Sequence, residues 1–363
     1  MSPRLVHLIA AARPNFMKVA PLYHVLSRQG WCTARVVHTG QHYDANMSDA
    51  FFSDLRLPEP AYHLEIGSGS HAEQTGRTMI AYEAVCQRER PDAIVVVGDV
   101  NATAACAMVG AKLWIPVVHL EAGLRSRDRR MPEEINRLVT DAISDLLWTP
   151  SRDADANLLA EGVPAEKIDC IGNIMIDSFE MLRAKIEAAD ACRRLQLQRP
   201  FALVTLHRPS NVDACDKLEE LVRSLVELSR ELTVLFAVHP RTRRRLEEFG
   251  LLEAITEAPA VRVTEPLRYV DFMSLLMSCS IAITDSGGVQ EESTYLGIPC
   301  VTLRENTERP ITIAEGTNRL LKPPDLVEAA REVLAGRWPS GRKPALWDGH
   351  AAERAALSLR TRL

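Results

Sequence analysis

Short apolar runs alternate with longer helical patterns along the whole chain. Leu5–Ala11 and Ala93–Gly98 are rich in β-branched residues, whereas Met17–Gln29 follows a helical pattern. This alternation is typical of βαβ units, which build a parallel sheet with helices on its faces. In the first half the predicted strands are Leu5–Ala11, Ala34–Thr39, Ala93–Gly98, Pro116–Leu120 and Leu146–Pro150, and the predicted helices include Met17–Gln29 and Gln74–Arg90.

The second half has the same rhythm without a detectable sequence repeat. Its predicted strands are Phe201–Leu206, Thr233–Val238, Val261–Thr264, Ile281–Thr284 and Cys300–Leu303, and Asp216–Arg230 is a predicted helix. The pattern therefore indicates two doubly wound α/β domains, residues 1–172 and 173–349, joined where a short strand ends near residue 170. The last helix, within residues 350–363, follows a Pro/Gly-rich stretch and is expected to pack back on the first domain.

Composition favours a globular enzyme and argues against several other classes. A chain of 363 residues exceeds the usual single core, and its net charge of -5 argues against a general nucleic-acid binder. No apolar stretch approaches the roughly 20 residues that span a bilayer, and the N-terminus lacks a signal-peptide cleavage pattern. The eight cysteines are scattered without a Cys-x-x-Cys pair. We expect a cytoplasmic protein with no membrane or nucleic-acid partner.

The segment Thr284–Glu292 has the composition of a phosphate-binding turn. It follows an apolar run, and Gly287 and Gly288 allow the backbone to approach a ligand closely. The N–H groups that open the next helix are unpaired donors at the positive end of the helix dipole. Glu292, one turn further on, is placed to accept a hydrogen bond from a ribose hydroxyl. By itself the segment also fits a plain turn.

Three carboxylates are expected at one edge of the first sheet. Asp99 and Glu121 each follow a predicted strand, and Glu133 lies at the start of a helix, although each alone also fits ordinary helix-start composition. Carboxylates that share a site push one another's pKa values apart, which suits one as acid and another as base. The available cationic partners are Arg13, Arg125 and Arg137. His119 and Glu121 resemble half a metal site, but no second histidine stands at ligand spacing, so no metal is expected.

Basic segments follow the strands of the second half at matching places. They are His207-Arg208-Pro209-Ser210-Asn211, His239-Pro240-Arg241 and Thr307-Glu308-Arg309-Pro310. Together with the turn at 286–288 they predict a positive rim suited to a diphosphate.

The motifs, in this order and over nearly the whole chain, resemble the non-hydrolysing UDP-N-acetylglucosamine 2-epimerases. The matching segments are Ala12-Arg13-Pro14, Lys18-Val19-Ala20-Pro21, Thr39-Gly40-Gln41-His42, Gly98-Asp99, His119–Arg125, Pro132–Arg137, His207-Arg208, Thr284–Glu292, Thr307–Pro310 and Glu315–Asn318. The resemblance implies a GT-B architecture, with two Rossmann-like domains facing across a cleft, and a homodimer.

The resemblance also implies a reaction. A base removes the C2 proton while UDP leaves C1, and UDP then adds back to a 2-acetamidoglucal that is reprotonated on its other face. The roles implied are acid/base carboxylates at Asp99, Glu121 and Glu133, leaving-group assistance by His207, cleft cations at Arg13, Lys18 and Arg309, a phosphate seat at Ser286, Gly287 and Gly288, a ribose contact at Glu292 and uracil packing at Phe272. No redox cofactor or metal is implied.

Departures from the family pattern leave alternatives open. The first loop ends in Arg13-Pro14-Asn15 where the family often has Arg-Pro-Glu, which allows a UDP-2-acetamido sugar modified at C3 or C6. Gln41 and His42 match a loop that binds an activating UDP-GlcNAc in many bacterial members, but Gly67–His71 supplies no arginine for that site. A GT-B glycosyltransferase, a hydrolysing 2-epimerase and a non-catalytic sensor are the other interpretations.

Overall fold

The computed structural model describes residues 3–40 and 54–363, which divide into two units. The first unit contains the chain up to Leu182 together with Ala345–Leu363, and the second contains Arg183–Pro344. The division falls within helix α7 (Ile174–Ala188), which begins just after the join that the sequence pattern places near residue 170.

A parallel sheet of seven strands forms the centre of the first unit, within the described residues, in the order β3-β2-β1-β4-β5-β6-β7. The chain winds outward from β1 to β3 and then returns to place β4 on the other side of β1. This reversal creates a topological switch point between β1 and β4, where doubly wound sheets bind ligands. The strands are β1 (Arg4–Ala10), β2 (Cys32–His38), β3 (Tyr62–His63), β4 (Ala93–Val97), β5 (Val117–Leu120), β6 (Leu146–Thr149) and β7 (Ile168–Cys170).

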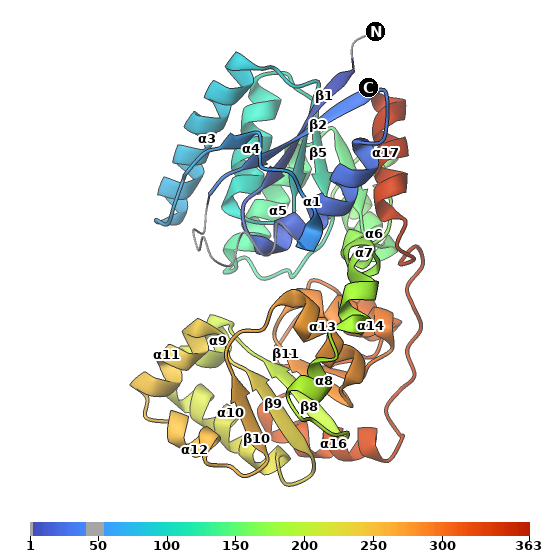
Figure 1. The fold of residues 1–363 in the computed structure, drawn as a ribbon. Helices are drawn as coiled ribbons and strands as arrows, with labels where there is room; N and C mark the ends of the chain where they lie inside the picture. The colour runs from blue at the N-terminus through green and yellow to red at the C-terminus, as the bar shows by residue number, and fades with distance from the viewer. Residues whose placement is uncertain (1–2, 41–53) are drawn as a thin grey trace. The chain divides into compact units, whose positions relative to one another are not determined.

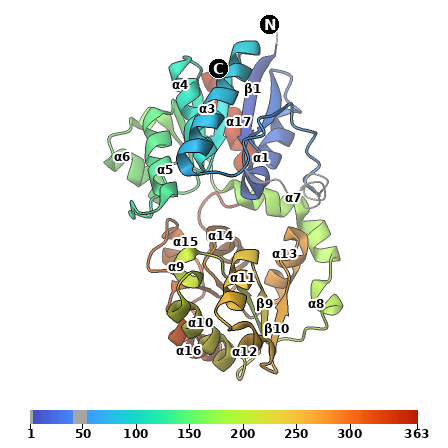
Figure 2. The same cartoon turned by 90° about the vertical axis from the view of Figure 1, so that its left-hand side faces the viewer.

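Helices cover both faces of this sheet, and α3 and α4 lie side by side in Figure 2. They are α1 (Arg13–Leu26), α3 (His71–Arg88), α4 (Asn101–Lys112), α5 (Pro132–Ile143), α6 (Arg152–Ala160), α7 (Ile174–Ala188) and α17 (Ala351–Arg362), with a 3-10 turn η1 (Ala165–Lys167). The small residues of α4 allow it to approach the sheet closely. A Cβ added at Gly110 would lie 2.6 Å from Val117 Cγ2 and 2.9 Å from Ile94 Cδ1, so only glycine fits there.

The C-terminal helix α17 belongs to the first unit and packs against α1 (Figure 1). Its first turn is tied down by Asp177, whose carboxylate accepts from the backbone N–H groups of Ala351 (3.1 Å) and Ala352 (2.8 Å). The indole of Trp347 donates to the Pro150 carbonyl at 3.0 Å. These contacts explain why a segment that follows the second unit in sequence folds with the first.

The second unit repeats the same winding with a parallel sheet in the order β10-β9-β8-β11-β12-β13. Its switch point lies between β8 and β11. The strands are β8 (Phe201–Thr205), β9 (Thr233–Ala237), β10 (Val261–Thr264), β11 (Ile281–Thr284), β12 (Cys300–Thr302) and β13 (Asn318–Leu320). The helices are α8 (Ala191–Arg194), α9 (Pro209–Val212), α10 (Cys215–Leu228), α11 (Pro240–Glu248), α12 (Leu252–Thr256), α13 (Tyr269–Ser278), α14 (Gly287–Leu296), α15 (Ile311–Ala314) and α16 (Leu326–Leu334), with a 3-10 turn η2 (Pro323–Asp325).

The predicted strands are all present, with bounds that differ by at most two residues. Three of the predicted helices begin earlier than expected, α10 by one residue and the other two by about a turn. Pro14 lies in the first turn of α1, and α3 begins at His71 because Ser70 and Glu73 form a reciprocal capping box. Among the described helices, none has both the length and the low charge that a membrane span requires.

Candidate functional site

The first candidate site is built at the switch point of the first sheet. Lys18 comes from α1, which follows β1, whereas Asp99 follows β4 and Glu121 follows β5. The loop ends of three adjacent strands therefore bring these side chains to one edge, as expected from the sequence. Gly98 lies between them with φ +68°, and a Cβ there would stand 3.3 Å from Glu121 Oε2 and 3.5 Å from Lys18 Nζ.

Glu121 and Lys18 form a buried ion pair at this edge, with exposed side-chain fractions of 8% and 10%. Glu121 also has a left-handed backbone, with φ +75°. Its N–H and that of Ala122 both donate to the Trp148 carbonyl at 3.0 Å, which holds this conformation. Such a backbone costs a non-glycine residue about 1–3 kcal/mol and is retained chiefly where function needs the side chain in that place.

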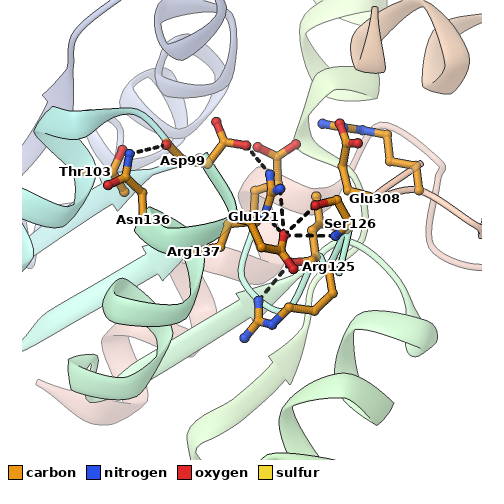
Figure 3. Close-up of polar contacts among 12 residues, drawn as sticks. Asp99, Thr103, Glu121, Arg125, Ser126, Asn136, Arg137 and Glu308 are labelled. Atoms are coloured by element: carbon orange, nitrogen blue, oxygen red, sulfur yellow. Dashed lines mark hydrogen bonds and ion pairs between the residues drawn. The ribbon is translucent and has the colours of Figure 1, made fainter. Parts of the chain in front are cut away.

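Asp99 is held by helix α5 (Figure 3). Its carboxylate forms an ion pair with Arg137, and its backbone carbonyl accepts from Asn136 Nδ2 at 2.9 Å. Arg137 is buried and also pairs with Glu134 at 2.8 Å. Glu133 lies three and four residues before Asn136 and Arg137, so all three share one face of α5. The third predicted carboxylate is thus on the helix face that contacts Asp99.

Helix α5 has an inverted distribution of side chains. Its buried positions include Glu134, Arg137 and Asp141, whereas Ile135 and Val139 are each 37% exposed. Buried charges are stable only when they are paired and hydrogen-bonded. The buried face of α5 therefore acts as a scaffold of ion pairs beneath the edge that carries Asp99 and Glu133.

Arg125, a cation available to the three carboxylates in the sequence, pairs with two other carboxylates in the structure. Its guanidinium instead binds Asp141 at 2.7 Å and Glu161 at 2.6 Å. Arg125 is buried, and both of its partners lie elsewhere on the first unit, on α5 and at the end of α6. A buried guanidinium must pair with carboxylates that lie close to it in the folded protein, and the order of residues in the sequence does not reveal which ones these are.

Asn15, the departure in the first loop, has a structural role. Its Oδ1 accepts from the backbone N–H of Ala12 at 2.9 Å, and its Nδ2 donates to the Val97 carbonyl at 3.1 Å. The side chain is buried, and it ties the start of α1 to the end of β4. The amide thus holds together the two loops that form the switch point.

The second candidate site lies at the switch point of the second sheet. His207 follows β8 and Asp285 follows β11, and His207 Nδ1 lies 2.9 Å from Asp285 Oδ1. Asp285 is fully buried and also accepts from the backbone N–H of His207 (3.0 Å) and Arg208 (2.8 Å). Burial raises the pKa of Asp285, but these donors and the His207 ring outweigh it and lower the pKa overall. With Nδ1 directed to Asp285, the other ring nitrogen of the part-exposed His207 is free of that contact and can face a ligand.

A cluster of arginines and carboxylates surrounds the predicted phosphate turn. Arg309 binds Glu291 at 2.8 Å and Glu308 at 2.5 Å, and Glu308 also forms an ion pair with Arg304 at 2.8 Å. Burial raises the pKa of Glu308, but the surrounding guanidinium groups lower it far below its ordinary range. A Cβ on Gly287 would lie 2.7 Å from Arg309 Cζ, so the guanidinium rests directly on the bare glycine. Helix α14 starts at this glycine and provides N–H donors there.

The expectation of a common positive rim needs one correction within the second unit. Arg241 and Arg245 of α11 both pair with Asp213, at 2.5 Å and 3.3 Å, and not with the groups at the turn. His239 is the part of that segment next to His207, with ring centroids 5.3 Å apart.

Glu292 and Phe272 lie on α14 and α13. Phe272 is half-buried, whereas Glu292 is buried and accepts from the Tyr269 hydroxyl at 2.8 Å. Burial raises the pKa of Glu292 to about 8, and the nearby Glu291 adds to the rise.

Replacing Glu292 by glutamine should remove a pH dependence of stability. Because its folded pKa lies above the ordinary value, the stabilising contribution of the protonated carboxyl is complete below pH 4.5 and is lost as the pH rises through 8. The free energy of unfolding of the unmodified protein should fall relative to that of Glu292→Gln across this window, by about 1.4 kcal/mol per unit of pKa shift. Urea unfolding at several pH values measures it, with exposed Glu253→Gln as control. Parallel profiles for the unmodified protein and Glu292→Gln would contradict the assignment.

Three predicted residues remain expectations. Gln41 and His42, the possible activator loop, lie outside the described residues. Arg13 begins α1, but its side chain is outside what the structure describes.

The sequence pattern did not single out Glu134, Asp141, Asp285 or Glu308 as functional candidates, although all four organise the two sites. Two signals were available. Polar residues at positions 134, 137 and 141 recur at helical spacing on one face of α5, and Asp285 directly precedes the phosphate turn.

Known proteins resemble this chain over most of its length. The family model for UDP-N-acetylglucosamine 2-epimerase matches residues 24–360. A UDP-N-acetylglucosamine 2-epimerase of Methanocaldococcus jannaschii is 42% identical over 322 residues, which cover 86% of this chain and 87% of that protein. A UDP-2,3-diacetamido-2,3-dideoxy-D-glucuronate 2-epimerase of Pseudomonas aeruginosa is 41% identical over 330 residues, which cover 90% and 89%.

A solved structure gives the same result for the fold. The crystal structure of the Methanocaldococcus jannaschii UDP-GlcNAc 2-epimerase in complex with UDP-GlcNAc and UDP matches with a TM-score of 0.91 and 39% identity, and the match covers 98% of this chain and 99% of that one. The predicted α/β, GT-B-like fold class is thereby confirmed. The chain belongs to the UDP-N-acetylglucosamine 2-epimerase family.

Proposed function

We propose that the protein interconverts UDP-GlcNAc and UDP-ManNAc by eliminating and re-adding UDP. The observation that carries the proposal is the group of carboxylates at the first switch point, where Glu121 is paired with Lys18 and Asp99 with Arg137. Inversion at C2 requires one group to remove a proton from one face and another to deliver a proton to the opposite face. Glu133, on the α5 face that contacts Asp99, completes the set.

In the elimination step, two electron pairs move. A carboxylate accepts the C2 proton, the C2–H electron pair becomes the C1–C2 double bond, and the C1–O pair leaves with the β-phosphate of UDP. The reverse step protonates C2 on the other face while a UDP oxygen attacks C1. Ion pairs with Arg137 and Lys18 keep Asp99 and Glu121 in place during both steps, so little reorganisation is needed when charge moves.

The second unit has groups suited to hold the departing UDP. The turn at Ser286 and Gly287 opens α14, where backbone N–H groups favour a phosphate. Arg309 rests on Gly287 with a guanidinium that suits bidentate phosphate binding, and His207, oriented by Asp285, can donate to a leaving oxygen. Phe272 and Glu292 are the proposed contacts for uracil and ribose.

The number of carboxylates favours an epimerase over a GT-B glycosyltransferase. A transferase needs one base to activate its acceptor, whereas epimerisation uses separate acid and base groups. Asp99, Glu121 and Glu133 at one edge exceed what transfer requires.

A second candidate substrate is a UDP-2-acetamido sugar modified at C3 or C6. The Pseudomonas aeruginosa protein that bears such a name is 41% identical to this chain, and the Methanocaldococcus jannaschii UDP-GlcNAc 2-epimerase is 42% identical. These identities do not separate the two substrates. The chemistry at C2 is the same for both.

Incubation with UDP-GlcNAc in heavy water should introduce deuterium at C2 and give a mixture of gluco and manno UDP-sugars. Proton NMR of the sugar follows both changes. Absence of exchange at C2 with UDP-GlcNAc, but exchange with a UDP-2,3-diacetamido sugar, would select the second candidate. Release of free ManNAc would indicate the hydrolysing reaction, and no exchange with either sugar would reject the epimerase proposal.

A homodimer and a cytoplasmic location are part of the proposal. Ile135 on α5 is 37% exposed, and together with Met79 and other residues of α3 it lines a hollow of about 520 Å³. Exposed apolar side chains at one surface are typical of an interface between subunits. The scattered cysteines support a reducing compartment.

A further inference from the structure

His119 is a buried histidine whose two ring nitrogens are both engaged. Nδ1 lies 2.5 Å from Asp141 Oδ1, and Nε2 lies 2.8 Å from the Gly98 carbonyl oxygen. The side chain has no exposed surface. A carbonyl oxygen can only accept, so Nε2 carries a hydrogen, and the short contact with a carboxylate requires a proton between Nδ1 and Asp141 as well. The geometry therefore places a hydrogen on Nε2 and a proton between Nδ1 and Asp141.

Asp141 is itself fixed by further donors. Arg125 binds its second oxygen at 2.7 Å, and the backbone N–H of Gly123 donates to the same oxygen at 3.1 Å. Burial raises the pKa of Asp141, but the charges of His119 and Arg125 outweigh it and lower the pKa. The Arg125 guanidinium and the Gly123 N–H therefore favour the ionised carboxylate, which can accept a hydrogen bond from His119 Nδ1.

The hydrogen bond from His119 reaches the residue directly before Asp99. Gly98 has φ +68°, a conformation in which glycine alone is unstrained, so its carbonyl is free to turn unless something holds it. Helix α5 already holds Asp99 through Asn136 and Arg137. The hydrogen bond from His119 Nε2 fixes the Gly98 carbonyl, on the other side of the peptide bond that joins Gly98 to Asp99.

We propose that His119 is a positioning residue for Asp99, kept doubly protonated by Asp141 so that its Nε2–H holds the Gly98 carbonyl. The proposal rests on the proposed epimerase function, because it assumes that Asp99 acts on the sugar. Asp141 binds one ring nitrogen of His119 and the Gly98 carbonyl binds the other, which makes the pair one unit.

The first experiment records ring nitrogen-15 NMR spectra of the full-length protein at pH 7. His7 provides an internal comparison, because it is equally buried in the same sheet and burial lowers its pKa to about 4. We expect two protonated nitrogens in the His119 ring and one in the His7 ring. A His119 ring with a single N–H would overturn the proposal.

The second experiment compares His119→Gln with His7→Gln in the C2 exchange assay. Glutamine has one side-chain nitrogen where histidine has two. It therefore cannot bind Asp141 and the Gly98 carbonyl as the ring does, and the turn before Asp99 loosens. We expect kcat for exchange to fall by about 100-fold in His119→Gln, with KM and the Kd for UDP unchanged, because small misplacements of a catalytic group have effects of this size. His7→Gln should lower stability without changing kcat.

The outcomes separate this inference from the proposed function. If the unmodified protein exchanges C2 and His119→Gln exchanges it equally fast, the positioning role is wrong and the epimerase proposal stands. If the unmodified protein does not exchange C2, the epimerase proposal fails and the positioning role fails with it. If His119→Gln does not fold, the ring spectrum of the unmodified protein decides: two protonated nitrogens support the proposal and one rejects it.

Discussion

Replacing Glu133 by glutamine should abolish hydrogen exchange at C2 of UDP-GlcNAc while UDP binding survives. Glutamine has almost the same shape as glutamate, but its amide neither accepts nor delivers the proton. Loss of a positioned acid or base lowers the rate by about 10²- to 10⁴-fold. Glu133 is only half-buried at the start of α5, so the fold should tolerate the change. Proton NMR in heavy water measures exchange, and calorimetry measures the Kd for UDP.

Glu83→Gln is the matched control for this substitution. Glu83 is an exposed glutamate on α3 of the same unit, so the same chemical change there should leave exchange as it is. Exchange at the normal rate in Glu133→Gln would remove this carboxylate from the mechanism. Loss of UDP binding together with exchange would make Glu133 a structural residue.

Gly287→Ala should weaken UDP binding by about 10- to 100-fold. The new Cβ would overlap the Arg309 guanidinium, which must move away and lose its ion pairs with Glu291 and Glu308. Charge-assisted hydrogen bonds contribute about 1.5–3 kcal/mol each, and 1.4 kcal/mol is a factor of ten in Kd. The clash is with the end of a flexible side chain, so the second unit should still fold.

Gly288→Ala separates the effect on Arg309 from the effect of a methyl group on the turn. A Cβ at Gly288 would meet only the Ser286 hydroxyl, at 4.0 Å. Both substitutions place a methyl group near the proposed phosphate, but one alone displaces Arg309. Calorimetry with UDP should therefore give the weaker binding for Gly287→Ala. Equal Kd values would show that Arg309 does not contribute to the phosphate seat.

The sheets were predictable from sequence because buried parallel strands are continuous apolar runs. β4 and β8 are read directly from Ala93–Val97 and Phe201–Thr205. The short strand β13 (Asn318–Leu320) was not predicted, since three residues with two polar side chains carry no such pattern. The meeting of Asp99 and Glu121 at one sheet edge was also predictable, because loops after parallel strands meet at one edge whatever the details of packing.

The pairing of those residues was not predictable. Arg125 was expected beside the acid/base carboxylates and instead binds Asp141 and Glu161. Arg137 forms the ion pair with Asp99. Nothing in the spacing of these residues distinguishes the two arginines. Their partners follow from where α5 and α6 lie against the sheet.

Local residue patterns are sufficient to specify the alternation of strands and helices, and also the carboxylates, cations and glycines that stand at the strand ends. Both follow from local rules, namely the period of apolar side chains and the position of loops in a parallel sheet. The tertiary structure alone decided that Lys18 pairs with Glu121, that His119 is held between Asp141 and Gly98, and that Arg309 rests on Gly287. Ion pairs and hydrogen bonds form only at about 3 Å, and the order of strands in the folded sheet sets which distant residues reach that distance.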